Sequence, residues 1–151
     1  MAKYLFLILV LLFSNQAFSE SNVSKLEKPI LSTINKGEIS NLASLAFPKG
    51  KKNARRYISD SDIEGLDITF RNTLSLLGDY YGYKLFHEAV IQDLYIIRYY
   101  ILKYERQPIL LKLEFYRPND SWVINGMEFD TGLDNYMEDS AKSYIGNLSN
   151  E

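Results

Sequence analysis

The sequence predicts an α+β fold in which N-terminal helices pack on a four-stranded antiparallel meander. Two observations lead to this fold class. Between positions 25 and 77, apolar residues recur at spacings of three and four, which is the periodicity of helices buried along one side. From Tyr80 onward, Tyr, Ile, Leu, Phe and Val dominate, and turn-forming residues return at short intervals, as is typical of consecutive strands.

The N-terminus has the three parts of a secretory signal peptide. Lys3 gives a positive start, residues 4–13 form an unbroken apolar run, and Ala17-Phe18-Ser19 places small residues at the −3 and −1 positions of a cleavage site. The run is too short for a membrane span, which needs about 20 apolar residues. We expect cleavage after Ser19 and a single mature domain over residues 20–151, periplasmic or secreted from a bacterium, with no stable membrane insertion.

The composition argues against several functional classes. The 17 basic and 19 acidic residues give a net charge of −2, so the chain lacks the basic surface that nucleic-acid binding requires. It has no cysteine and one histidine, which cannot form a multi-histidine metal site. No glycine-rich loop followed by Lys-Ser or Lys-Thr is present. We therefore expect no cofactor, no metal and no nucleic-acid partner.

The first helical region covers residues 25–47. Its apolar residues form two sets, before and after Gly37: Leu26, Ile30 and Ile34, then Ile39, Leu42, Leu45 and Ala46. Because glycine favours turns over helix interiors, we expect two helices joined by a tight turn at residues 35–37. The segment ends at Pro48, and a polar, basic loop follows to about residue 59.

The second helical region, residues 60–77, is better marked. Ser59 or Ser61 can act as the N-cap, with Asp62 or Glu64 three residues later, which is the capping-box pattern. An apolar stripe follows along one side of the helix: Ile63, Leu66, Phe70, Leu74 and Leu77. We expect this stripe to face the sheet.

Four strands are predicted over residues 81–91, 94–105, 108–117 and 122–130. The connections are short, and the clearest is Pro118-Asn119-Asp120-Ser121. Short connections force neighbouring strands to be antiparallel, which gives a meander. An alternative is a tight hairpin at Asn125-Gly126 within the fourth segment.

The alternation of side chains indicates how the sheet is covered. In the third strand Ile109, Leu111, Leu113 and Phe115 face the core, and the intervening residues are mostly wet. The second strand is apolar or aromatic on both faces, as a central strand covered on both sides would be. Helices then cover one face. Either a partner or a C-terminal helix capped by Thr131, with Leu133, Tyr136 and Met137, shields the other.

This order of elements resembles the nuclear-transport-factor-2-like, or cystatin-like, superfamily. Residues 32–47 (STINKGEISNLASLAF) are similar to its opening helix pair, and residues 99–130, with aromatic-Tyr-Arg-Pro-turn-Trp at 115–122, are similar to its closing strands. The resemblance covers about residues 25–130. It implies a cone-like half-barrel with a pocket between helices and sheet, typically dimeric through the outer sheet face, and it favours the small exported bacterial members.

Four side chains are candidates for a ligand-binding pocket: Tyr83, His87, Arg98 and Tyr100. In a regular strand His87 shares a face with Tyr83; it is either an acid or base near neutral pH or a half-buried strand residue. The tyrosines either line a pocket with their hydroxyls or simply pack their rings. No motif assigns a catalytic residue, although Asp62, Asp67, Asp93 and Glu88 are available carboxylates.

Arg98 interrupts an apolar set in the middle of the second strand. A buried arginine needs a carboxylate or a ligand anion, and we expect a cross-strand pair with Glu88 or Glu114 ahead of an anion site.

The leading hypothesis is an exported, non-catalytic binding or interaction module of unknown ligand that forms a homodimer through the sheet face. The alternative is a small pocket enzyme of the isomerase or lyase type, with a tyrosine and a carboxylate near Arg98 and His87. The two differ in whether the four candidate side chains converge on one cavity.

Overall fold

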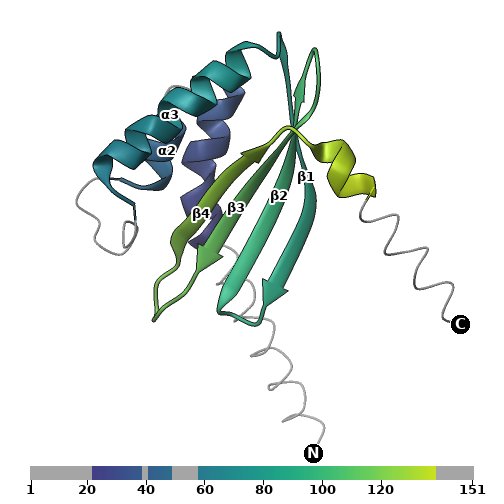
Figure 1. Cartoon of the computed structure of the whole chain (residues 1–151). Coiled ribbons are helices and arrows are strands. Elements are labelled where there is room, and N and C mark those ends of the chain that lie inside the picture. The colour runs from purple at the N-terminus through teal and green to yellow at the C-terminus, as the bar shows by residue number, and fades with distance from the viewer. Residues whose placement is uncertain (1–21, 39–40, 49–57, 139–151) are drawn as a thin grey trace, which may run out of the picture.

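A computed structural model of the chain describes residues 22–38, 41–48 and 58–138. It confirms the predicted α+β class, with helices followed by an open four-stranded antiparallel sheet in the order β1-β2-β3-β4 (Figure 1). The labelled elements are α2 (Leu42–Ala46), α3 (Asp60–Ser75), β1 (Tyr80–Ile91), β2 (Tyr95–Tyr104), β3 (Ile109–Tyr116) and β4 (Val123–Asp130). Residues 22–35 and 133–138 are also helical. The predicted signal peptide and its cleavage site lie outside the described residues.

The helix boundaries follow from local chemistry. Gly37 has a φ of +72° and ends the first helical stretch, as expected, because a left-handed residue cannot continue a helix. The N-terminus of α3 is a capping box: the Ser59 side chain accepts a hydrogen bond from the Asp62 amide, and the Asp62 carboxylate accepts one from the Ser59 amide. Beyond α3, Gly78 has a φ of +77°.

The four strands lie within one residue of their predicted bounds. The alternative hairpin at Asn125-Gly126 is wrong. Gly126 pairs with Glu114 inside β4, and the strand continues after it to Asp130, which pairs with Leu110. The turn at residues 117–122 already joins β3 to β4, and the residues after Gly126 remain paired with β3. The only irregularity in this pairing is at Asn125, which is an extra residue between the partners of Glu114 and Phe115.

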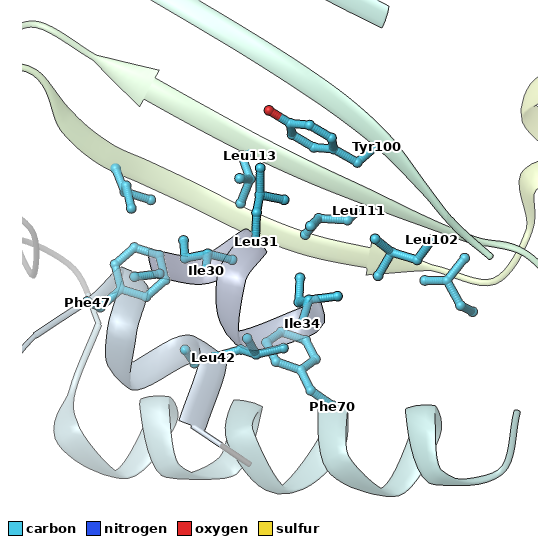
Figure 2. Packing of buried hydrophobic residues seen from close by; sticks show 14 of the residues in the cluster. Ile30, Leu31, Ile34, Leu42, Phe47, Phe70, Tyr100, Leu102, Leu111 and Leu113 are labelled. Carbon is cyan, nitrogen blue, oxygen red and sulfur yellow. The ribbon is translucent and has the colours of Figure 1, made fainter. Parts of the chain in front are cut away.

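The helices cover one face of the sheet, called here the inner face (Figure 1). The inward residues of β3 are Ile109, Leu111, Leu113 and Phe115, and all four are fully buried, as the alternation predicts. Figure 2 shows Ile30, Leu31 and Ile34 from the first helical stretch between the sheet and α3. Phe70 of α3 packs on Phe129 of β4 with 4.5 Å between ring centroids, so the α3 stripe also reaches the sheet margin.

The described residues cover the opposite, outer face of the sheet only in part. Tyr95, Ile97, Tyr99 and Ile101 of β2 alternate with the buried inner residues and are half-buried. Residues 133–138 lie on this side, where the Tyr136 ring contacts the rings of Phe86 and Tyr99. Within the described ranges, no helix is both long enough and apolar enough to span a membrane.

Candidate functional site

A buried polar cluster joins the first helical stretch to the inner face of the sheet. The Arg98 guanidinium donates from Nη1 to Glu27 Oε1 at 2.7 Å and from Nε to Glu88 Oε2 at 2.5 Å. The Tyr100 hydroxyl donates to the other oxygen of Glu27 at 2.6 Å. The side chains of Arg98 and Glu27 are 6% and 11% exposed, so this is a nearly dry charge pair. The cluster is the most concentrated polar chemistry that the described residues place in the core.

The electrostatics of the cluster favour a permanently paired arginine. Burial acts to lower the pKa of Arg98, but the hydrogen bonds that Arg98 donates to Glu27 and Glu88 outweigh it and raise that pKa above its ordinary value. Burial, and then the bond to Glu27, raise the pKa of the Tyr100 hydroxyl well above its usual value. Among the described residues, no buried side-chain nitrogen or oxygen lacks a hydrogen-bond partner. The cluster therefore satisfies itself without a ligand anion.

Three of the four candidate residues lie on the inner face. Tyr83 packs edge-on against Tyr100 with ring centroids 5.8 Å apart, and Tyr100 and Arg98 share Glu27. The cross-strand pair that was expected for Arg98 is confirmed with Glu88. The other candidate partner, Glu114, lies on the outer face, where it pairs with Lys112.

His87 does not join this cluster, so the expectation that it shares a face with Tyr83 is wrong. Leu85 pairs with Tyr100 and His87 pairs with Tyr99, its neighbour, which shows one extra residue in β1 at Phe86. The extra residue shifts the alternation of side chains by one position. Residues on opposite sides of the bulge that are two apart in the sequence, such as Leu85 and His87, therefore lie on opposite faces of the sheet. His87 therefore lies on the outer face, with its ring 6.0 Å from that of Tyr99.

Sequence reasoning missed Glu27, the residue that organises the cluster. A signal for it exists in the helical periodicity, because Val23, Glu27, Ile30 and Ile34 fall on one side of the helix. All four are buried, with Glu27 8% exposed. An acid within an apolar stripe must find a cation or hydrogen-bond donors when it is buried. Arg98 in the apolar inward set of β2 is its complement.

The available carboxylates on the helices have structural roles. Asp67, only 6% exposed, accepts hydrogen bonds from the backbone amides of Ala43 and Ser44 and from the Ser44 hydroxyl, at 2.6, 3.3 and 2.6 Å. It thereby caps the N-terminus of α2, whose own N-cap residue supplies no side-chain bond. Asp62 belongs to the capping box of α3.

The outer face carries a second polar network. Lys112 lies between Glu114 and Glu128 at 2.7 and 3.3 Å, and the Tyr95 hydroxyl donates to Glu114 at 2.7 Å. Asn125 donates to the same hydroxyl at 3.1 Å. Its cation is more exposed than that of the inner cluster, at 27% for Lys112 against 6% for Arg98, and Glu128 is 63% exposed.

A shallow depression of about 530 Å³ lies along the first half of α3, lined by Ile58, Ser61, Asp62, Gly65, Leu66 and Thr69. None of the four candidate residues lines it. Nowhere in the described ranges do three or more His, Cys, Asp or Glu side chains gather to hold a metal ion. No family model, curated protein or solved structure matches the chain.

Proposed function

We propose that the protein is an exported, non-catalytic binding or interaction module that works as a homodimer through its sheet. Its signal peptide is removed after Ser19, and the mature chain acts in the periplasm or outside the cell. We also propose that it adopts the cone-like arrangement of the nuclear-transport-factor-2-like superfamily, whose members associate through the sheet.

One observation carries this proposal: large apolar side chains are exposed along one margin of the sheet. Six of them lie between residues 81 and 94, with exposed fractions from 39% to 61%: Tyr81, Leu85, Phe86, Val90, Ile91 and Leu94. Single exposed apolar residues are ordinary, but a contiguous group of this kind is typical of a surface that another molecule covers.

The inner cluster supports a binding module rather than a pocket enzyme. A catalytic acid or base must reach a substrate, whereas Glu27, Arg98 and Tyr100 use their hydrogen-bonding groups on one another and are nearly dry. His87, the other candidate acid or base, lies on the opposite face of the sheet.

The test is to express the full-length sequence in a bacterium and to follow its product. We expect release by osmotic shock, Glu20 as the first residue, and a dimer in sedimentation at micromolar concentration. Native mass spectrometry of the same sample identifies any retained ligand. Recovery of chains that still begin at Met1 from the membrane fraction would contradict export, and a monomer at all concentrations would contradict the homodimer.

A further inference from the structure

β1 is an edge strand of unusual length and composition. The strand order places β1 and β4 at the two edges of the sheet, so among the described residues each leaves one row of backbone N–H and C=O groups without a strand partner. β4 has eight residues, and charged Glu128 and Asp130 near its end are exposed. β1 has twelve residues and exposes five large apolar side chains beside Lys84, His87 and Glu88, whereas every exposed side chain of β4 is polar. Polar and charged side chains protect an edge against pairing, so β1 is the edge better suited to accept a further strand.

The exposed apolar side chains of β1 lie on both faces of the sheet. Leu85 and Val90 pair with inward residues of β2 but are 52% and 54% exposed, which shows that the helices stop short of this margin. On the outer face Phe86 and Ile91 are 39% and 61% exposed. A molecule that merely stacked on one face would leave the other exposed. A strand added to the edge covers both faces, because its side chains alternate between them.

We propose that the partner is a second copy of this chain, with the two β1 edges paired antiparallel about a two-fold axis into a continuous eight-stranded sheet. This inference rests on the proposed homodimer and specifies its contact. A symmetric contact sets the same strand opposite itself, so the strand must be complementary to its own reverse.

The bulge in β1 decides the register. Paired residues must share a face, and the extra residue puts Phe86 and His87 together on the outer face, with Leu85 and Glu88 both on the inner face. An axis through Phe86 or His87, at the centre of the strand, would therefore oppose inner and outer side chains. An axis between Phe86 and His87 matches the faces of every pair along the strand: Phe86 with His87, Leu85 with Glu88, Lys84 with Ala89, and Tyr83 with Val90.

Charge and area agree with this antiparallel pairing. The two copies of Lys84 would stand five residues apart along the strands, about 16 Å, so this pairing sets no like charges opposite each other. A parallel pairing in register would instead stack lysine on lysine. The half-exposed side chains and the twelve-residue edges together remove on the order of 1,000 Å² from water, about the minimum for a specific interface.

The register is tested by charge at Leu85 in protein produced from the full-length sequence. Leu85→Glu sets a carboxylate opposite Glu88 at both symmetry-related positions of the dimer. We expect the dimer to be at least tenfold weaker by sedimentation. Leu85→Lys meets the same glutamate with an ammonium group, and we expect a clearly smaller loss. The matched control is Leu76→Glu, which changes an even more exposed leucine, 66%, beyond the end of α3; it should leave the dimer unchanged.

A second variant and a direct measurement guard against misfolding at one position. Val90→Lys with Ile91→Lys changes only exposed side chains and should also weaken the dimer at least tenfold, with an unchanged circular dichroism spectrum. In the unmodified protein, amides of β1 that face away from β2 should exchange hydrogen more slowly as protein concentration rises.

The outcomes separate the inference from the proposed function. Dimers that resist both β1 variants but are split by Tyr99→Glu would overturn edge pairing and retain a homodimer through the sheet face. A monomer at every concentration would overturn both. A monomer that carries a stoichiometric foreign protein, released by the Val90 and Ile91 variant, would assign the edge to a foreign strand and overturn self-pairing.

Discussion

Arg98 and Lys112 lie on adjacent strands, on opposite faces of the sheet, and each pairs with two glutamates. On the inner face Arg98 joins Glu88 on the neighbouring strand to Glu27, which is 71 residues away in the sequence, and its side chain is 6% exposed. On the outer face Lys112 joins Glu114 and Glu128 within the β3–β4 pair, and its side chain is 27% exposed.

The difference between the two networks lies in desolvation. Removing one member of a nearly dry pair leaves an uncompensated buried charge, so the inner network is costly to break even where its net contribution to folding is small. Water and salt screen the outer pairs and take the place of a lost partner. The inner network thus fixes where the first helical stretch packs on the sheet, whereas the outer network joins side chains at the surface and contributes little to the fold.

The largest expected effect is at Arg98. Arg98→Ala leaves Glu27 buried without its cation, and we expect a loss of about 3–5 kcal/mol in the free energy of unfolding, measured by urea denaturation. The double variant Arg98→Met with Glu27→Gln removes both charges and keeps an acceptor for Tyr100, so it should be more stable than Arg98→Ala alone. A loss below about 1 kcal/mol for Arg98→Ala would mean that the pair is solvated after all.

A smaller effect is expected at alkaline pH from the inner-face tyrosines. Burial first, and then the neighbouring Tyr104 and Tyr83, raise the pKa of Tyr80 from 10.0 to about 12. A raised pKa means that the fold favours the protonated phenol, so this stabilisation is complete below pH 10 and is lost as pH rises toward 12. We expect the urea midpoint to fall over that range, by the equivalent of about 1–2 kcal/mol for a partly solvated group.

Tyr80→Phe tests the assignment of this pH dependence. Without the hydroxyl, the fall between pH 10 and 12 should be shallower than in the unmodified protein, even though the variant also loses the 3.3 Å hydrogen bond to Asn35 at neutral pH. Equal slopes for the two proteins would show that Tyr80 does not contribute to the alkaline loss.

The smallest effect is expected on the outer face. Lys112→Met removes the cation between Glu114 and Glu128, yet Tyr95 still donates to Glu114, and both carboxylates reach water. We expect a loss of about 1 kcal/mol or less in the free energy of unfolding, which decreases further at high salt. A cost equal to that of Arg98→Ala would remove the distinction between the two faces.

The structure confirms the predictions that depend on neighbours in the sequence. The Ser59 capping box, the turn at Gly37 and the buried inward set of β3 need only contacts between nearby residues or a period of two or four. The bounds of the four strands follow from the turn residues between them.

The features that sequence reasoning got wrong or left open depend on how the elements pair and pack, which no single strand or helix encodes. Periodicity placed His87 with Tyr83, and one extra residue at Phe86 moved it to the other face. Asp67 was an available carboxylate without a role, and the packing of α3 against α2 made it the cap of α2.

The sequence by itself therefore determined the fold class and the order of the elements, because helix and strand periods and short turns are local properties. It also indicated a cross-strand glutamate for Arg98 but left Glu88 and Glu114 open, and the strand register decided for Glu88. Only the tertiary structure decided that Glu27 completes the Arg98 cluster and that β1 keeps apolar side chains exposed on both faces. Both depend on where the first helical stretch lies across the sheet. That position results from packing among residues far apart in the chain, which no local pattern records.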